Sequence, residues 1–358
     1  MSTVNDTFDE LLKPTGPAAL VYIEKLSPVE GHDAIFFPPT FAKPQAEKTS
    51  SKDKEGQYDI NDMPGGTKRC TVDTRGSQAN RVEPLFKDRY ADLVPQIVVK
   101  IGDHEVNLLD AGHRAADAII RFSEVGKVLS EVFTAAKKGD LRPLAKIAPT
   151  SIVFGMWDSR GNDEEVSTML KRPRLFTSLI DAYDVAVRTR SAQYTPPVRY
   201  KDTGVIKDPD KVFDAMSSVG MNDVPSTGKL GGVQLMPNGE IRNTRTLNLI
   251  TLRTIEPGGK DGEATRRYIL GLALLAATAP RDYNLRQGCL LVRKEGDKPQ
   301  FVRVYSDGRR DPIPLDPEAV LAYARDAAKT FGVGESRTAK FSDDTANKTL
   351  HATKKKGE

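Results

Sequence analysis

The sequence is poor in the residues that build metal sites, disulfide frameworks and membrane spans. It has 358 residues but only two cysteines, Cys70 and Cys289, four histidines and one tryptophan. Two distant cysteines form neither a disulfide framework nor a zinc-ligand pattern, and they fit a reducing compartment. The longest apolar run, Tyr268 to Ala279, is too short to span a bilayer. The first twelve residues lack the apolar segment of a signal peptide, so we expect a cytoplasmic protein. With so few Cys and His residues, we expect neither a metal nor a cofactor.

Motifs of the common enzyme classes are also missing. No Gly-x-Ser-x-Gly nucleophile motif occurs. Gly228-Lys229 resembles the end of a phosphate-binding loop, but Asp223 stands where the first Gly is required and Leu230 follows in place of Ser or Thr. The remaining catalytic candidate is His32-Asp33, and this pair also fits an ordinary turn. The sequence therefore favours a binding protein, with no catalytic residue and no metal ligand assigned.

Charge is the first positive signal. The net charge is only +4, but Ile241 to Arg310 holds 14 Lys or Arg residues against 7 Asp or Glu, so the remainder sums to −3. A basic segment in an otherwise near-neutral protein fits a localised anionic partner.

Periodicity and punctuation predict a mixture of strands and helices. Strands are expected at Ala18–Leu26, at two segments around Gly102-Asp103, at Thr150–Trp157, at Leu247–Ile255, and in a hairpin of Gly288–Arg293 with Gln300–Tyr305. Helices are expected after a cap at Asp73 or Ser77, from Asp110 to Ser123, over Asp261–Ala279, and from Asp316 to Gly332. This order is compatible with a ferredoxin-like core, among several folds.

Three segments are too polar, or too rich in Gly and Pro, to belong to the core. Residues 43–66 are expected to form a flexible insertion and residues 334–358 a disordered basic tail. Residues 190–243 are expected to form a long irregular insertion, with one hairpin around Pro237-Asn238-Gly239.

Five short segments carry a family resemblance. They are Ser77–Glu83, Asp110–Ala118, Ile152–Arg160, Lys171–Ser178 and Tyr283–Cys289. In this order they resemble the backbone RAMP subunit of type I-G (formerly I-U) CRISPR effector complexes, over roughly Ala18 to Cys289. The resemblance implies an α+β fold: an RRM-like, ferredoxin-like palm with a helical elaboration, in which residues 190–243 form the thumb. The whole chain, residues 1–358, would be one such subunit.

The resemblance also implies a function. Such a subunit polymerises along CRISPR RNA (crRNA) and presents it for pairing with target DNA, so base pairing reads the sequence. The implied partners are the crRNA, target DNA through the crRNA, further copies of the chain, an RNA-end RAMP subunit, a large subunit and a helicase–nuclease, with no membrane. The alternative is a RAMP ribonuclease that cuts precursor or target RNA with His32 and Asp33.

The resembling segments and the basic stretch supply the candidate RNA-binding residues. They are Arg75, Ser77, Gln78, Asn80, Arg81, His113, Arg114, Arg172, Arg174, Ser178, Arg245, Arg253, Asn284, Arg286 and Gln287. Arginine supplies fixed charge with bidentate reach, and a helix N-terminus favours phosphate. Capped helices, a charged sheet edge or a helix-to-strand turn would explain the same residues structurally. Trp157 is expected as a partly buried anchor more than as a stacking platform.

Overall fold

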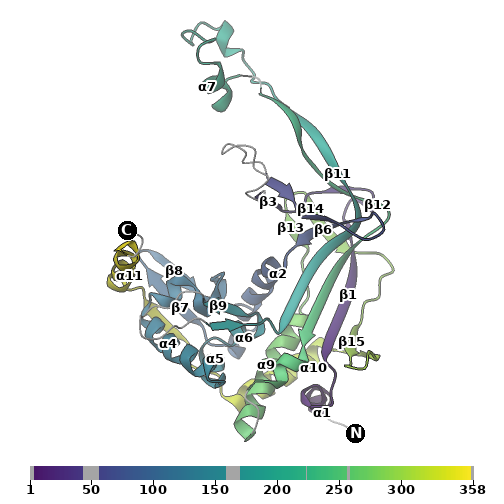
Figure 1. The fold of residues 1–358 in the computed structure, drawn as a ribbon, viewed down its shortest axis with the longest axis vertical. Coiled ribbons are helices and arrows are strands. Elements are labelled where there is room, and N and C mark those ends of the chain that lie inside the picture. Colours follow the sequence, from purple (N-terminus) through teal and green to yellow (C-terminus); the bar gives the residue numbers. More distant parts are fainter. Residues whose placement is uncertain (1–3, 43–55, 159–169, 223, 256–258, 356–358) are drawn as a thin grey trace.

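The computed structural model describes residues 4–42, 56–158, 170–222, 224–255 and 259–355, and its centre is an antiparallel sheet (Figure 1). Four strands, β1 (Ala19–Pro28), β11 (Phe176–Tyr194), β12 (Val224–Asn248) and β14 (Cys289–Arg293), lie in the order β14-β1-β12-β11. Helix α2 (Arg75–Val82) falls between β1 and β11 in the chain, and α9 (Gly259–Thr278) falls between β12 and β14. This β-α-β-β-α-β order is that of a ferredoxin-like core, so the predicted α+β palm is confirmed.

Further strands extend this sheet on both sides. Beyond β11 lie β6 (Lys68–Asp73) and β5 (Ile60–Asp62), and beyond β14 lies β13 (Asn284–Arg286). Strand β15 (Phe301–Val304) pairs with β1 and with β16 (Arg310–Ile313), and β2 (Ile35–Phe36) pairs with β12. Strands β3 (Thr40–Ala42) and β4 (Gly56–Tyr58) form a separate small ribbon.

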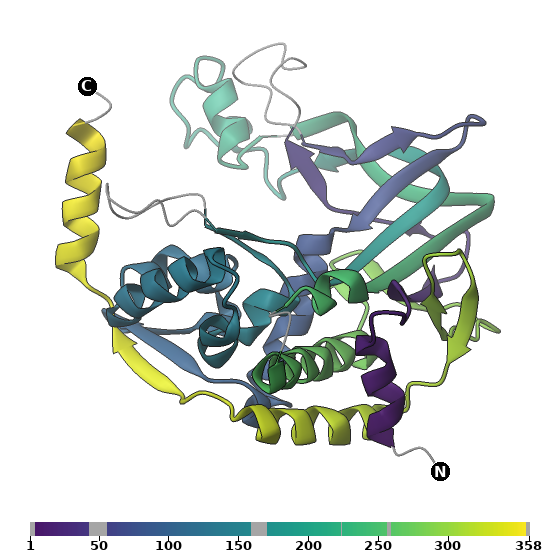
Figure 2. The same cartoon turned by 60° about the horizontal axis from the view of Figure 1, so that its bottom comes forward.

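The core lies between this sheet and two long helices. Along β1 alternate side chains are buried, as the sequence pattern predicted. Helix α9 is buried almost all round and packs along α10 (Pro317–Phe331), as Figure 2 shows. Their close approach depends on Gly271, where an added Cβ would lie 2.8 Å from the Cα of Ala324. The rings of Tyr268 and Phe331 stack with centroids 4.6 Å apart.

The helical elaboration packs beside the palm. Its helices are α3 (Ala118–Arg121), α4 (Glu124–Lys137), α5 (Arg142–Ile147) and α6 (Pro149–Val153). Its strands are β7 (Ile97–Ile101) and β8 (His104–Asn107), with the hairpin of β9 (Met156–Asp158) and β10 (Leu170–Arg172). Helices α1 (Val4–Asp9) and α8 (Leu249–Arg253) complete the lower part of Figure 1.

The thumb is a hairpin, and it is more regular than the sequence predicted. Strands β11 and β12 remain paired from the palm out to Tyr194 and Val224, and the segment between them carries α7 (Phe213–Ser218). Figure 1 shows this hairpin projecting from the palm. Pro237-Asn238-Gly239 makes a bulge, not the predicted turn, because Met236 to Gly239 all lie opposite Asp184.

Several other local predictions were wrong. The predicted helix from Asp110 to Ser123 is broken into short turns, and Asp117 caps α3 instead. Thr150–Trp157 begins with helix α6, and Leu249–Arg253 is helix α8. Strands β14 and β15 do not pair with each other, because each pairs with β1. The cap of α2 is Thr74, whose hydroxyl accepts a hydrogen bond from the Ser77 amide.

The predicted flexible segments are partly ordered. Residues 43–55 lie outside the described residues, whereas residues 56–62 contribute β4 and β5. The tail contains β17 (Arg337–Lys340), which pairs in parallel with β7, and α11 (Asp343–Lys355). Its described part therefore contains regular secondary structure, which the sequence did not predict. The helix from Pro317, capped by Asp316 and closed by Gly332, is confirmed.

Candidate nucleic-acid interface

A buried carboxylate organises the start of α2. Asp73 ends β6 and is fully buried. Its Oδ2 accepts from Gln78 Nε2 at 2.6 Å and from Arg81 Nε at 3.1 Å, and its Oδ1 lies 3.3 Å from Arg286 Nη2. Arg81 also donates to the carbonyl of Leu285 at 2.6 Å. Two arginines from distant segments therefore converge on one carboxylate, and this cluster ties α2 to β13.

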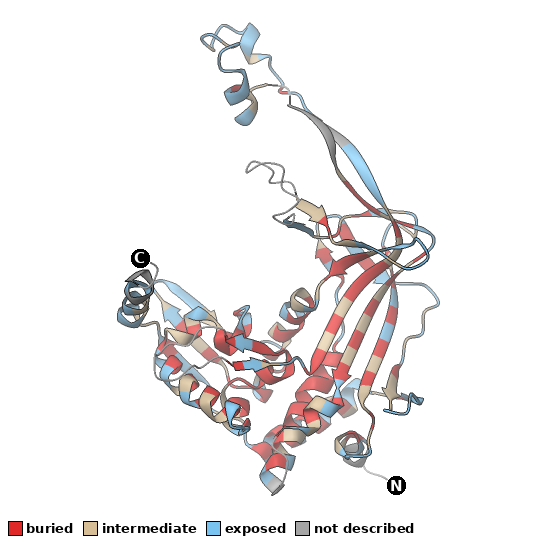
Figure 3. Cartoon of the chain, viewed as in Figure 1, coloured by how far each residue is buried: buried red, intermediate tan, exposed pale blue. Residues whose placement is uncertain are grey.

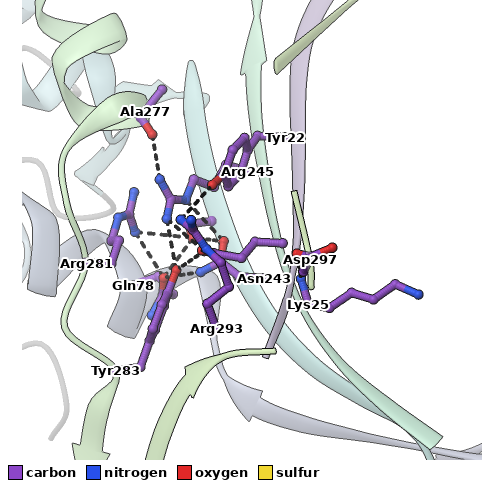
Figure 4. Close-up of polar contacts among 12 residues, drawn as sticks. Tyr22, Lys25, Gln78, Asn243, Arg245, Ala277, Arg281, Tyr283, Arg293 and Asp297 are labelled. Atoms are coloured by element: carbon purple, nitrogen blue, oxygen red, sulfur yellow. Dashed lines mark hydrogen bonds and ion pairs between the residues drawn. The ribbon is translucent and has the colours of Figure 1, made fainter. Parts of the chain in front are cut away.

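A second buried carboxylate, Glu24, lies on β1. Figure 4 labels three of its partners, Arg245, Tyr283 and Arg293. Glu24 accepts from Arg293 Nε at 2.7 Å, from the Tyr283 hydroxyl, and from Arg245 Nη2 at 3.3 Å. Arg245, on β12, also donates to the Ala277 carbonyl at the end of α9, 2.8 Å away. Burial raises the pKa of Tyr283, so this hydroxyl stays protonated and can donate. The cluster joins β1, β12 and α9.

Gln78 connects the two clusters. Its amide nitrogen binds Asp73, and its Oε1 accepts from the Ser178 hydroxyl at 2.7 Å and from Arg281 Nη1 at 3.1 Å. Burial, with the neighbouring charge of Arg245 as a smaller cause, lowers the pKa of Arg281 to about 9.

We call the whole assembly the palm network. Its members are Glu24, Asp73, Gln78, Arg81, Ser178, Asn243, Arg245, Arg281, Tyr283, Arg286 and Arg293. It holds five arginines against two carboxylates, so its own formal charge is positive.

The palm network changes the role of five predicted RNA-binding residues: Gln78, Arg81, Ser178, Arg245 and Arg286. Gln78, Ser178 and Arg245 are buried, and all three are hydrogen-bonded inside the protein. Arg81 and Arg286 are one-third or less exposed and are paired with Asp73. We infer from these contacts that the five side chains help to hold the palm together, and the RNA contact expected of them from the sequence stays a prediction.

Arg114 is also structural. Its guanidinium is buried, pairs with Glu83 at 2.6 Å and donates to the carbonyl of Gly155 at 3.2 Å. Burial raises the pKa of Glu83, and the charge of Arg114 opposes that rise. His113 is exposed, and its backbone amide donates to the Asp117 carboxylate. His113 and Asp117 flank a short 3-10 turn and do not lie on a continuous helix.

Arg253 is held by the N-terminal segment. It donates to the carbonyls of Leu11 and Pro17 at 3.1 and 3.0 Å, so it too is engaged in structure.

The other predicted residues remain near the surface. Arg75, Asn80, Arg174, Asn284 and Gln287 are exposed, and Ser77 and Arg172 are intermediate. Burial, and then the charges of Arg114 and Arg75, lowers the pKa of Arg174. Arg75 and Arg174 are therefore close enough to repel each other, although they are about a hundred residues apart in the sequence. This shared surface is the part of the predicted site that stays available to an anionic ligand.

Trp157 is the clearest departure from expectation. The sequence predicted a partly buried anchor, but the indole is 65% exposed, on β9. Alternation explains the difference, because the neighbouring Met156 and Asp158 take the two inward positions of this short strand. A strand shorter than the one predicted shifts which residues point outward.

The catalytic candidate His32 lies at the base of the thumb. Its Nε2 is 3.3 Å from the carbonyl oxygen of Met236, within the bulge of β12. With Lys25, Glu240 and Lys294 it lines a pocket of about 410 Å³. Asp33 is exposed, and its backbone carbonyl accepts from Gln234.

Across the described ranges, no group of three or more His, Cys, Asp or Glu side chains is placed to hold a metal ion. Among the helices in those ranges, none is both long and apolar enough to cross a membrane.

Comparison with known proteins gives one family. No curated protein matches the sequence. Residues 20–187, from β1 into β11, match the model of a family described as CRISPR-associated protein GSU0053. The matched segment includes α2, Asp73 and the β9–β10 hairpin. Just under half of the chain, 168 of 358 residues, is therefore similar to a CRISPR-associated family.

Proposed function

We propose that the chain is a crRNA-binding backbone subunit of a type I CRISPR surveillance complex, of the type I-G class. Copies of it polymerise along the guide RNA and hold the RNA ready to pair with target DNA, as part of prokaryotic antiviral defence. The subunit itself is not an enzyme. Its partners are the crRNA, further copies of itself, an RNA-end RAMP subunit, a large subunit and a helicase–nuclease.

The observation that carries this proposal is the union of a ferredoxin-like palm with a projecting thumb, in a chain that matches a CRISPR-associated family. The thumb exposes apolar side chains at its tip: Val205 is 69% exposed, Val219 67% and Phe213 52%. Figure 3 shows most of the described part of this tip in the colour of exposed residues. Exposed apolar groups on a projection support contact with another protein surface. A filament of identical subunits supplies such a surface at every step.

Charge supports an anionic ligand on the palm. The palm network has more arginines than carboxylates, and Arg75 and Arg174 add unneutralised charge at the surface. A backbone subunit needs contacts with phosphates, because base pairing carries the sequence information.

Co-expression with a CRISPR array tests the proposal. The protein should elute as a large assembly that contains RNA protected from added nuclease, and electron microscopy should show a regular filament. A monomer free of nucleic acid under these conditions would contradict it. Replacing the array by an unrelated transcript is the matched control for adventitious RNA.

A second candidate function, the RAMP ribonuclease, has one favouring observation. His32 shares its pocket with Lys25 and Lys294, and an imidazole beside cations is a combination that can cleave RNA without metal. Labelled RNA incubated with the protein, with and without a chelator, separates the two functions. The backbone subunit protects this RNA, whereas a ribonuclease shortens it and loses that activity in His32→Ala.

A further inference from the structure

The single tryptophan is held outward by a well-anchored hairpin. Met156 and Asp158, on either side of Trp157, are 6% and 3% exposed, and Leu170 on the paired strand is 6% exposed. Asp158 lies 3.5 Å from Arg121 in an ion pair, which fixes the end of β9. Trp157 therefore sits on a rigid base while its indole stays 65% in solvent.

The start of the hairpin is fixed as well. Gly155 has φ +77°, and a Cβ there would lie 2.8 Å from Cγ of Arg174 and 3.0 Å from the carbonyl oxygen of Arg172. The carbonyl of Gly155 accepts a hydrogen bond from buried Arg114. This close approach brings the segment after β10, with Arg174, against the segment that enters β9.

One cation, Lys171, lies over the indole, and two arginines, Arg75 and Arg174, lie in neighbouring segments. Lys171 is directly opposite Trp157 in the strand register, and its Nζ lies 5.8 Å from the ring centroid. Arg174 follows β10 and lies near Arg75 at the start of α2. In the described part of the chain, no carboxylate forms an ion pair with Arg75, Lys171 or Arg174. We call Trp157, Arg75, Lys171 and Arg174 the Trp157 patch.

We propose that the Trp157 patch is a stacking site for one nucleobase of a single-stranded RNA, with Arg75 and Arg174 on the adjacent phosphates. The inference rests on the proposed function and adds a specific contact to it. Bases stack on exposed aromatic side chains whatever their sequence, and arginines beside the ring neutralise the backbone. Each nucleotide supplies both an aromatic face for the indole and a negative charge for the cations. A protein partner would need separate side chains for these two contacts.

Because Trp157 is the only tryptophan, its fluorescence reports on this site alone. The purified full chain is titrated with a short oligouridylate and, separately, with an abasic backbone of equal length. The oligouridylate should quench the emission, and the abasic strand should bind more weakly with little quenching. Trp157→Ala should weaken oligouridylate binding by about five- to a hundred-fold, whereas Trp157→Phe should keep most of the affinity.

Leu290→Ala is the matched control, since Leu290 is a 42% exposed apolar residue on β14. It should bind RNA like the wild type, and both Trp157 variants should melt like the wild type. If the wild type binds RNA with unchanged tryptophan emission, and Trp157→Ala binds it with unchanged affinity, this inference is overturned and the proposed function stands. An emission change that follows protein concentration without RNA makes Trp157 a subunit contact and also overturns it. Absence of any RNA binding by the wild type overturns the proposed function together with this site.

Discussion

Arg81 and Arg174 lie in segments that looked equally basic in the sequence, and they have opposite surroundings. Arg81 is paired with buried Asp73 and donates to the Leu285 carbonyl. Arg174 is exposed as a residue, and partial burial of its guanidinium, followed by the charges of Arg114 and Arg75, lowers its pKa. A guanidinium with a buried carboxylate holds elements together, whereas one among other cations is left to bind an external anion.

The largest expected effect comes from removing the shared carboxylate. Asp73→Ala leaves Arg81 and Arg286 without their counter-charge in a buried site, so it should lower the free energy of unfolding by about 3–5 kcal/mol. Urea unfolding measures this. The matched control is Asp92→Ala, which breaks an exposed pair with Arg325 and should cost at most about 1 kcal/mol. Equal effects of the two substitutions would remove the distinction between the palm network and the surface.

Next comes the tip of the thumb. Replacing residues 195–222 with a short turn removes Phe213, Val205 and Val219 but leaves the pairing of β11 with β12 in place. The monomer should melt close to the wild type, because the core lies in the palm, and regular assembly on RNA should be lost. Calorimetry and electron microscopy measure the two results. If the variant unfolds, the tip belongs to the core. If the variant still forms filaments, the tip has no role in assembly.

Salt dependence gives a smaller and more selective effect. Each phosphate contact to a single strand adds about 0.7 to the slope of log affinity against log salt concentration. Arg75→Ala combined with Arg174→Ala should therefore lower that slope by about 1.4. Arg81→Ala should leave the slope unchanged under conditions in which the variant is folded, since Asp73 and the Leu285 carbonyl already hold that guanidinium. A slope that falls only in Arg81→Ala would reverse the two assignments.

The smallest effect concerns the two thiols. Burial raises the pKa of Cys70 to about 12 and that of Cys289 to about 11, so neither should react with a thiol reagent at neutral pH in the native protein. Cys289 lies near Asp73 and Cys70 is on the same strand as Asp73, so Asp73→Ala should speed their modification by opening this region more often. Trp157→Ala should not. Fast modification of the wild type would show that the region around Asp73 is open.

The sequence predicted the fold better than the site. Alternation in β1 and the capped stripe of α10 are local signals, and the resemblance supplied the palm. Which arginines are buried depends on long-range register: Asp73 meets Arg286, 213 residues away, only after β6 and β13 join the same sheet. A buried carboxylate that links distant strands, as Asp73 does, leaves no local pattern in the sequence. The thumb looked irregular because its Gly and Pro residues mark bulges, which a one-dimensional pattern does not separate from loops.

The most direct measurement is the affinity of a labelled single-stranded RNA for two double variants, each tested where it is fully folded. Arg75→Ala with Arg174→Ala should lose about 1–3 kcal/mol of binding free energy and keep its melting temperature. Arg81→Ala with Arg286→Ala should melt at a lower temperature and bind RNA like the wild type. Weak binding and unchanged melting in the Arg81 and Arg286 pair would contradict the division between structural and RNA-binding arginines.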